Sequence, residues 1–117
     1  MKITIVGSMQ FYDKYKELKI VLEGMNHKVI LPLPNKTKLK AMQDFNKDLE
    51  KSDAILVANY DKNGIKNYIG VNGLMEVGMA YNRKRKIFIL NKIPDNCKIE
   101  FEAMKVTELN GDLTKIK

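Results

Sequence analysis

Two acidic residues follow the most apolar run of the chain and could act on a bound ligand. The run from Ala54 to Ala58 has no polar alternation, which predicts a strand that is buried on both faces. Asp61 comes just after this run, and Glu76 is expected in the first turn of the next helix. Because ligands bind at the carboxyl edge of open parallel sheets, Asp61 and Glu76 are candidates for catalysis.

Each acid also has a purely structural interpretation. An acid in the first turn of a helix that is capped by Asn72 or Gly73 favours the helix dipole. The same field would keep the Glu76 carboxylate ionised, as a nucleophile requires. Asp61 opens the turn sequence Asp-Lys-Asn-Gly, but the long loop from Asn59 to Asn72 could also present it as a general acid or base. Both interpretations of each acid stay open on this pattern.

Gly7 and Ser8 follow a first predicted strand, Lys2 to Val6, and precede a helix. Backbone N–H groups and the Ser8 hydroxyl could hold a phosphate or a sugar hydroxyl at this position. The pair matches neither the P-loop nor the dinucleotide-binding fingerprint. A tight strand-to-helix turn explains it equally well.

The remaining polar candidates favour structural roles. Asp44 and Asp48 lie on a predicted helix and are expected in solvent, with one of them able to face the cleft. Asp53 is assigned to a helix-to-strand junction, and His27 is expected to pack rather than to catalyse. In the long loop, Tyr60 and Tyr68 offer flat surfaces for a planar ring.

Strands and helices alternate along the whole chain. The predicted strands are residues 2–6, 27–31, 54–58, 86–90 and 106–109, and the predicted helices are about 11–24, 39–51, the segment around 72–81 and 98–104. This alternation predicts a single α/β domain over residues 1–117, a doubly wound parallel five-stranded sheet of flavodoxin-like or Rossmann-like order 2-1-3-4-5. In that order the loop after the first strand lies beside the loop after the third.

The composition excludes several classes of protein. The chain has 117 residues, of which 44% are hydrophobic, and no apolar run approaches the roughly 20 residues that span a bilayer. Cys97 and His27 are single, which excludes an internal disulfide, a cysteine zinc cluster and a histidine-rich metal site. The first residues read as a strand and not as a signal peptide, so a cytoplasmic location is expected.

The formal net charge of +7 comes almost entirely from lysine, since Arg83 and Arg85 are the only arginines. Base-edge and bidentate phosphate recognition favour arginine, and the lysines are spread along the chain. We therefore expect a solvated lysine surface rather than a nucleic-acid groove. The charge could still steer anionic small molecules toward the protein.

Three segments carry a family pattern: Gly7-Ser8-Met9, Ser52 to Val57, and Asn72 to Tyr81. Together they resemble the nucleoside 2-deoxyribosyltransferase superfamily, which includes the 2'-deoxynucleoside 5'-monophosphate N-hydrolases. The resemblance covers nearly the whole chain, and its most specific piece is Glu76 followed by x-Gly-x-Ala. In that family the glutamate attacks the anomeric carbon of the sugar. The resemblance thus implies that Glu76 is the nucleophile and that no metal or redox cofactor is required.

The same resemblance implies further site residues. Those expected to line the sugar or phosphate pocket, or to lie near the 5' substituent of the sugar, are Gly7, Ser8, Met9, Asn72 and Gly73. Asp61 would orient or protonate the base. The family usually forms homodimers in which the partner's C-terminal region closes the pocket, and Met104 is a counterpart for that closing residue.

The sequence therefore predicts cleavage or transfer at the N-glycosidic bond of a (2'-deoxy)nucleoside or nucleoside 5'-monophosphate. Departure of the base leaves an oxocarbenium-like sugar, which a carboxylate stabilises or captures. One alternative is a nucleotide-binding or sensing module on the same fold with little or no catalysis. Another is nucleic-acid binding through the lysines. The sequence does not decide which base is preferred or whether a 5'-phosphate is required. It also leaves open whether water or a second base is the acceptor.

Overall fold

A computed structural model describes residues 1–117 and contains a five-stranded parallel sheet of order β2-β1-β3-β4-β5. The strands are β1 (Lys2–Val6), β2 (Lys28–Ile30), β3 (Ala54–Val57), β4 (Lys86–Ile89) and β5 (Thr107–Glu108). The helices are α1 (Tyr12–Gly24), α2 (Lys38–Lys51), α3 (Val71–Asn82) and α4 (Lys98–Ala103). All neighbouring strands run parallel, so the predicted fold class and strand order are confirmed.

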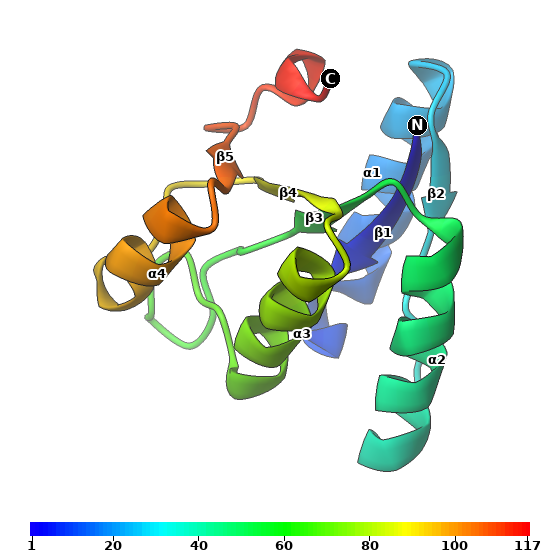
Figure 1. The fold of residues 1–117 in the computed structure, drawn as a ribbon, viewed down its shortest axis with the longest axis horizontal. Helices are drawn as coiled ribbons and strands as arrows, with labels where there is room; N and C mark the ends of the chain where they lie inside the picture. The colour runs from blue at the N-terminus through cyan, green and yellow to red at the C-terminus, as the bar shows by residue number, and fades with distance from the viewer.

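Helices cover both faces of the sheet (Figure 1). Helix α1 lies behind the sheet, while α2, α3 and α4 lie in front of it. The hydrophobic core is accordingly divided in two, with Leu56 of β3 in the half that contains α1. Ile55 and Val57 belong to the half that contains α2, α3 and α4. Strand β3 is buried on both faces, as its unbroken apolar run predicts.

Some boundaries differ from those predicted. Strands β2 and β5 are shorter than expected, because each is an edge strand that pairs on one side only. Helix α1 begins at Tyr12, after a separate 3₁₀ turn formed by Met9–Phe11. The Ser8 hydroxyl caps that turn, accepting a hydrogen bond from the backbone N–H of Gln10 at 3.4 Å.

Helix α3 begins earlier than predicted. Gly70 is its N-cap, with extended backbone angles of φ −82° and ψ 174°, and the first helical residue is Val71. Asn72 and Gly73 are of residue types that often cap helices, but both lie inside the helix. The prediction that Glu76 lies in the first turn was therefore wrong, because that turn contains no acid and Glu76 belongs to the second.

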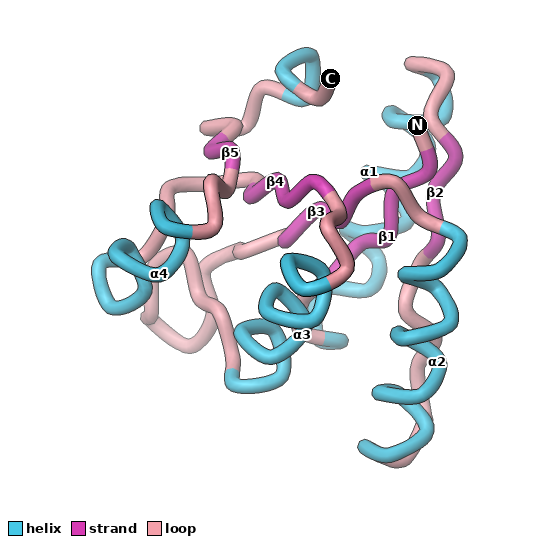
Figure 2. The backbone as a smooth tube through the Cα atoms, in the orientation of Figure 1, coloured by secondary structure: helices cyan, strands magenta, loops and turns pink.

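The long connection between β3 and α3 is visible as a loop in Figure 2. Lys62 and Ile65 exchange two backbone hydrogen bonds of 2.9 Å around Asn63 and Gly64. These two central residues have φ angles of 51° and 80°. Both angles are positive, as in the two-residue Asn-Gly turns that close β-hairpins. The predicted turn is thus confirmed.

No helix in the molecule is both long enough and apolar enough to pass through a bilayer.

Candidate active site

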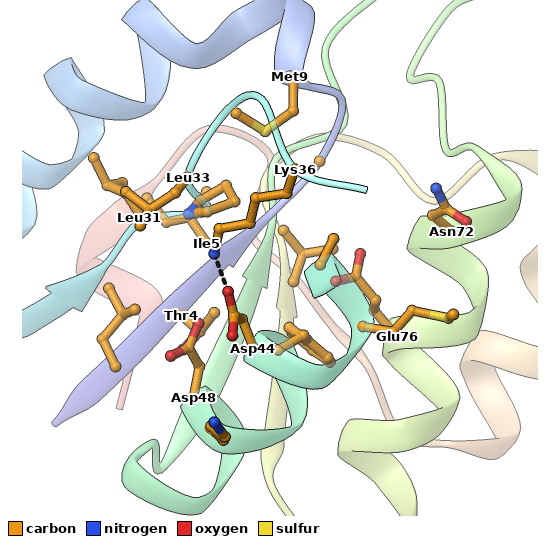
Figure 3. A pocket seen from close by; sticks show the side chains of 18 of the residues that line it. Thr4, Ile5, Met9, Leu31, Leu33, Lys36, Asp44, Asp48, Asn72 and Glu76 are labelled. Atoms are coloured by element: carbon orange, nitrogen blue, oxygen red, sulfur yellow. Dashed lines mark hydrogen bonds and ion pairs between the residues drawn. The ribbon is translucent and has the colours of Figure 1, made fainter. Parts of the chain in front are cut away.

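A cavity of about 730 Å³ lies between α2 and α3, beside β1 and the end of β2 (Figure 3). Its size is within the range of small-molecule sites, which is roughly 300–1,000 Å³. One wall is apolar and includes Ile5, Leu31 and Leu33. The polar side chains converge from the two helices, with Glu76 on α3 and Asp44 and Asp48 on α2. An apolar wall opposite a few polar groups is suited to a planar heterocycle attached to a polar ring.

Glu76 lies in the second turn of α3 and lines the cavity. Burial raises the pKa of its carboxyl group from 4.5 to about 7, and the nearby Lys38 charge offsets part of that rise. Burial therefore opposes the helix field that was expected to keep this carboxylate ionised, and the carboxyl group ionises near neutral pH. The field is strongest at the first turn, and loss of solvation outweighs it at the second.

The charge of Glu76 also affects the pKa of Tyr15. Its side chain is fully buried, and its hydroxyl donates a hydrogen bond of 2.6 Å to the backbone oxygen of Ser8. Burial raises the pKa of the Tyr15 hydroxyl, and the charges of Tyr60 and Glu76 raise it further. Tyr15 therefore remains protonated and serves as a fixed hydrogen-bond donor at the end of β1.

Asp44 and Asp48 lie one helical turn apart on α2, and both line the cavity. Asp44 forms ion pairs with Lys36 and, at 3.1 Å, with Lys40, and these hydrogen bonds lower its pKa. Burial raises the pKa of Asp48, although the charges of Lys36 and Lys51 oppose the rise. The sequence predicted that one of these two acids could face a cleft, and the structure places both there.

The loop after β1 reaches the cavity only in part. Gly7 and Met9 line the cavity, whereas Ser8 does not. The Ser8 hydroxyl accepts a hydrogen bond of 3.0 Å from the Lys62 ammonium. A Cβ atom at position 7 would lie 2.3 Å from the Tyr15 hydroxyl oxygen, so packing alone requires a glycine at this turn.

Of the other predicted site residues, only Asn72 lines the cavity. Gly73 does not, and a Cβ atom at Gly73 would meet the Ile69 side chain at 3.2 Å. Asp61 is exposed and outside the cavity wall, and its carboxylate accepts a hydrogen bond of 2.8 Å from the backbone N–H of Asn67. Met104 packs against the core next to α4 and does not line the cavity of its own chain.

Lys36 and Lys38 also line the cavity and were not singled out in the sequence. They flank Thr37, the N-cap of α2, which accepts a hydrogen bond of 3.1 Å from the backbone N–H of Lys40. Thr37 followed by a helical pattern was a readable start signal for this helix. The i, i+4 spacing of Asp44 and Asp48 places both acids on one helix face, and that spacing was the signal available for them.

No protein-family model matches the sequence, and no curated protein does either. Solved structures, however, match the fold. A CMP N-glycosidase from Clostridium botulinum superimposes with a TM-score of 0.67 at 13% identity, over 92% of this chain and 87% of the glycosidase. A 2-deoxyribosyltransferase from Leishmania mexicana gives 0.62 at 16% identity, over 83% of this chain and 69% of the transferase.

The chain shares the fold of these two enzymes. A conserved protein from Enterococcus faecalis shares it as well, with a TM-score of 0.55 at 17% identity over 90% of this chain and 74% of that protein. The resemblance seen in the sequence is thus confirmed as a likeness of fold. At such identities the roles of individual residues are argued from this molecule's own geometry.

Proposed function

We propose that the protein cleaves or transfers the N-glycosidic bond of a (2'-deoxy)nucleoside or nucleoside 5'-monophosphate, with Glu76 as nucleophile. The observation that supports this most is the desolvated Glu76 carboxyl group, which faces a cavity of small-molecule size. The fold adds support, since it is shared with a CMP N-glycosidase and a 2-deoxyribosyltransferase.

The chemistry is a double displacement at the anomeric carbon. A carboxylate oxygen of Glu76 bonds to C1' as the N-glycosidic bond breaks, and the bonding electrons leave with the base, which then takes a proton from solvent. Water or a second base next attacks C1' and releases the carboxylate. A poorly solvated anion gains more from the positive charge that develops on the sugar than a solvated one does. Burial of Glu76 therefore favours the transition state.

Asp48 is the better-placed residue to hold the base. It faces the cavity from α2, across from Glu76 on α3 (Figure 3). An ionised Asp48 can accept a hydrogen bond from an N–H group of the base and so orient the leaving group. Asp61, which the resemblance implies for this role, points its carboxylate to the backbone of its own loop.

Substitution of the two aspartates separates these assignments. Asp48→Ala is expected to lower kcat/KM by about 10- to 100-fold, the value of a hydrogen bond to a charged group. Asp61→Ala is expected to change it much less. The reverse order of effects would return the base-orienting role to Asp61.

The function itself is tested by chromatography of free base released from ribo- and deoxyribonucleosides and their 5'-monophosphates. Release by the wild type is expected, with a loss of at least about 10³-fold in Glu76→Ala, since the variant lacks the nucleophile. Dependence on an added acceptor base distinguishes a transferase from a hydrolase. Tight binding of these compounds without release, unaffected by Glu76→Gln, would instead support the binding or sensing module.

A further inference from the structure

Asp48 is a partly buried acid whose carboxylate has no donor within the chain. It lines the cavity from α2, and none of the ion pairs of the molecule involves it. Its main chain, by contrast, is fixed. The buried Ser52 hydroxyl donates a hydrogen bond of 2.7 Å to the Asp48 backbone oxygen and lies 2.6 Å from the Thr4 hydroxyl of β1. The structure therefore holds Asp48 against the sheet and leaves its carboxylate oxygens free for a ligand.

Asp44, one turn earlier on α2, is satisfied within the chain. Its carboxylate pairs with Lys36 and, at 3.1 Å, with Lys40. The Lys36 side chain is only 20% exposed and lines the cavity, whereas Lys40 is 55% exposed and does not line it. An ammonium group carries three N–H donors, and Lys36 uses one of them on Asp44. Two donors therefore remain at Lys36 for a ligand.

The free groups of Asp48 and Lys36 lie in the same part of the cavity. The Lys36 charge favours the ionised form of Asp48, although burial raises the pKa of that carboxyl group. Figure 3 shows the Lys36 ammonium bonded to Asp44, with Asp48 further along the same helix and Glu76 across the cavity. An ionised carboxylate only accepts hydrogen bonds and an ammonium group only donates them. This wall of the cavity thus presents two acceptor oxygens beside a donor.

Among the common nucleobases, guanine complements this arrangement. Along one edge it carries the O6 acceptor and then two neighbouring donors, N1–H and N2–H. Adenine and cytosine each place an acceptor ring nitrogen beside their only amino group, and uracil and thymine place one N–H between two carbonyl groups. A carboxylate that faces one of these other edges meets an acceptor, which it repels. Only guanine offers two donors to one carboxylate.

We propose that Asp48 and Lys36 select guanine as the base, with the Asp48 carboxylate accepting N1–H and N2–H and the Lys36 ammonium donating to O6. This inference rests on the proposed function and names the base that it leaves open. The apolar wall that includes Leu31 packs against the face of the purine, and a cavity of about 730 Å³ has room for a purine nucleoside. Hydrogen bonds to two charged groups supply the discrimination between bases.

The test compares base release from deoxyguanosine, deoxyinosine and deoxyadenosine, in whichever of the free and 5'-phosphorylated forms the enzyme cleaves. The wild type is expected to prefer deoxyguanosine over deoxyadenosine by about 10- to 100-fold in kcat/KM, the value of hydrogen bonds to a charged group. Deoxyinosine lacks only the 2-amino group, so it should fall between the two. In Asp48→Asn the amide places a donor beside an acceptor, which suits adenine, and the preference for guanine should disappear. Asp61→Asn is the control, because its carboxylate lies outside the cavity and is bonded to its own loop, and it should keep the wild-type preference.

A second pair of variants isolates the ammonium group. Lys36→Met should lower kcat/KM for deoxyguanosine and deoxyinosine alike, by about 10-fold, because both carry the O6 acceptor. It should leave deoxyadenosine nearly unchanged. Lys40→Met is the matched control, because Lys40 also pairs with Asp44 but does not line the cavity, and it should change none of the three.

A wild type that releases adenine or a pyrimidine as fast as guanine, or an Asp48→Asn variant that keeps the preference for guanine, would overturn the proposal. Calorimetric binding of the same three compounds to Glu76→Gln separates this failure from failure of the proposed function. If no base is released but the guanine compound binds most tightly and Asp48→Asn removes the difference, the base site stands without the catalysis. Equal binding of all three compounds, or no binding, would overturn it.

Discussion

At the scale of single residues, the ionisation of Glu76 decides both rate and stability. The carboxyl group must be ionised to attack C1', yet burial raises its pKa to about 7. In the free enzyme the ionised, attacking form therefore becomes the major one only above a pH of about 7.

The first prediction concerns rate. Below a pH of about 7, kcat/KM is expected to rise nearly tenfold with each pH unit, and it should level off above that value because the free enzyme is then ionised. Steady-state assays of base release across this range measure the profile. A profile that is flat between pH 5 and about 8 would show that no group with the raised pKa of Glu76 takes part.

The second prediction concerns stability. The folded-state pKa of Glu76 lies above its ordinary value of 4.5, so the folded state binds the proton more tightly and loses stability as the pH rises from about 4.5 to about 7. Glu76→Gln removes this penalty and should raise the free energy of unfolding at about pH 8 by up to about 3 kcal/mol, at about 1.4 kcal/mol per pKa unit. Urea denaturation at about pH 4 should show little difference between the two proteins, and an equal gain at both pH values would contradict the prediction.

The sequence singled out Glu76 directly, but it left open which of Asp44 and Asp48 could face the cleft, and both line the cavity. Glu76 precedes a Gly-x-Ala pattern that can be read directly, whereas the side of α2 that meets a cavity depends on how the helix packs on β1. Asp61 was favoured because it follows a buried strand, a position that is often functional. The alternative interpretation, that Asp61 is a turn residue, agrees with the hydrogen bond that its carboxylate accepts from the backbone N–H of Asn67.

At the scale of elements, the turn after β1 connects packing to the site. Because Gly7 has no Cβ atom, the Tyr15 hydroxyl can pack against it. That hydroxyl donates a hydrogen bond to the backbone oxygen of Ser8 and so fixes the start of the loop after β1. The glycine was predicted as a ligand contact or as a tight turn. The structure shows that a close approach between α1 and β1 makes it necessary.

The third prediction follows from this contact. Gly7→Ala should destabilise the fold by about 1–3 kcal/mol, because its Cβ atom would lie 2.3 Å from the Tyr15 hydroxyl oxygen. Removing that oxygen in Gly7→Ala/Tyr15→Phe should make the double variant more stable than the sum of the two single effects predicts. Thermal unfolding of all four proteins measures the coupling, and strictly additive losses would mean that the steric contact is absent.

Strand positions were the most predictable elements, since apolar runs such as Ala54–Val57 are unambiguous. The start of α3 was not, because Asn72, Gly73 and Gly70 all suit a helix cap and only the backbone of Gly70 is extended. The path of the segment between β2 and α2, which brings Lys36 to Asp44, also depends on tertiary contacts that no local pattern encodes.

At the scale of the whole molecule, one apolar surface of α3 has no partner within the chain. Val71, Leu74 and Tyr81 are exposed along one side of this helix, and Val71 is 84% accessible. Gly78 lies between them with open space where a Cβ atom would be. A glycine inside a helix costs about 1 kcal/mol relative to alanine, and no contact within the chain compensates for it.

The fourth prediction is that a second copy of the chain covers this surface, in line with the homodimer that the resemblance implies. Light scattering should give twice the 13.5 kDa of the chain. Leu74→Glu should return the mass to that of one chain, since a charge in an apolar interface lacks a partner. Ile99→Glu, on the equally unpartnered but separate helix α4, should remain a dimer. A monomeric wild type would contradict the prediction.

If Glu76 is the nucleophile, it forms a covalent bond to the sugar, and that bond can be trapped. Enzyme mixed with a nucleoside 5'-monophosphate is quenched in acid within one turnover, digested, and examined by mass spectrometry. We predict a peptide that contains Glu76 and is heavier by the mass of the sugar phosphate, and no such peptide from Glu76→Gln. Undiminished release of base by Glu76→Gln, with no adduct on the wild type, would show that Glu76 is not the nucleophile.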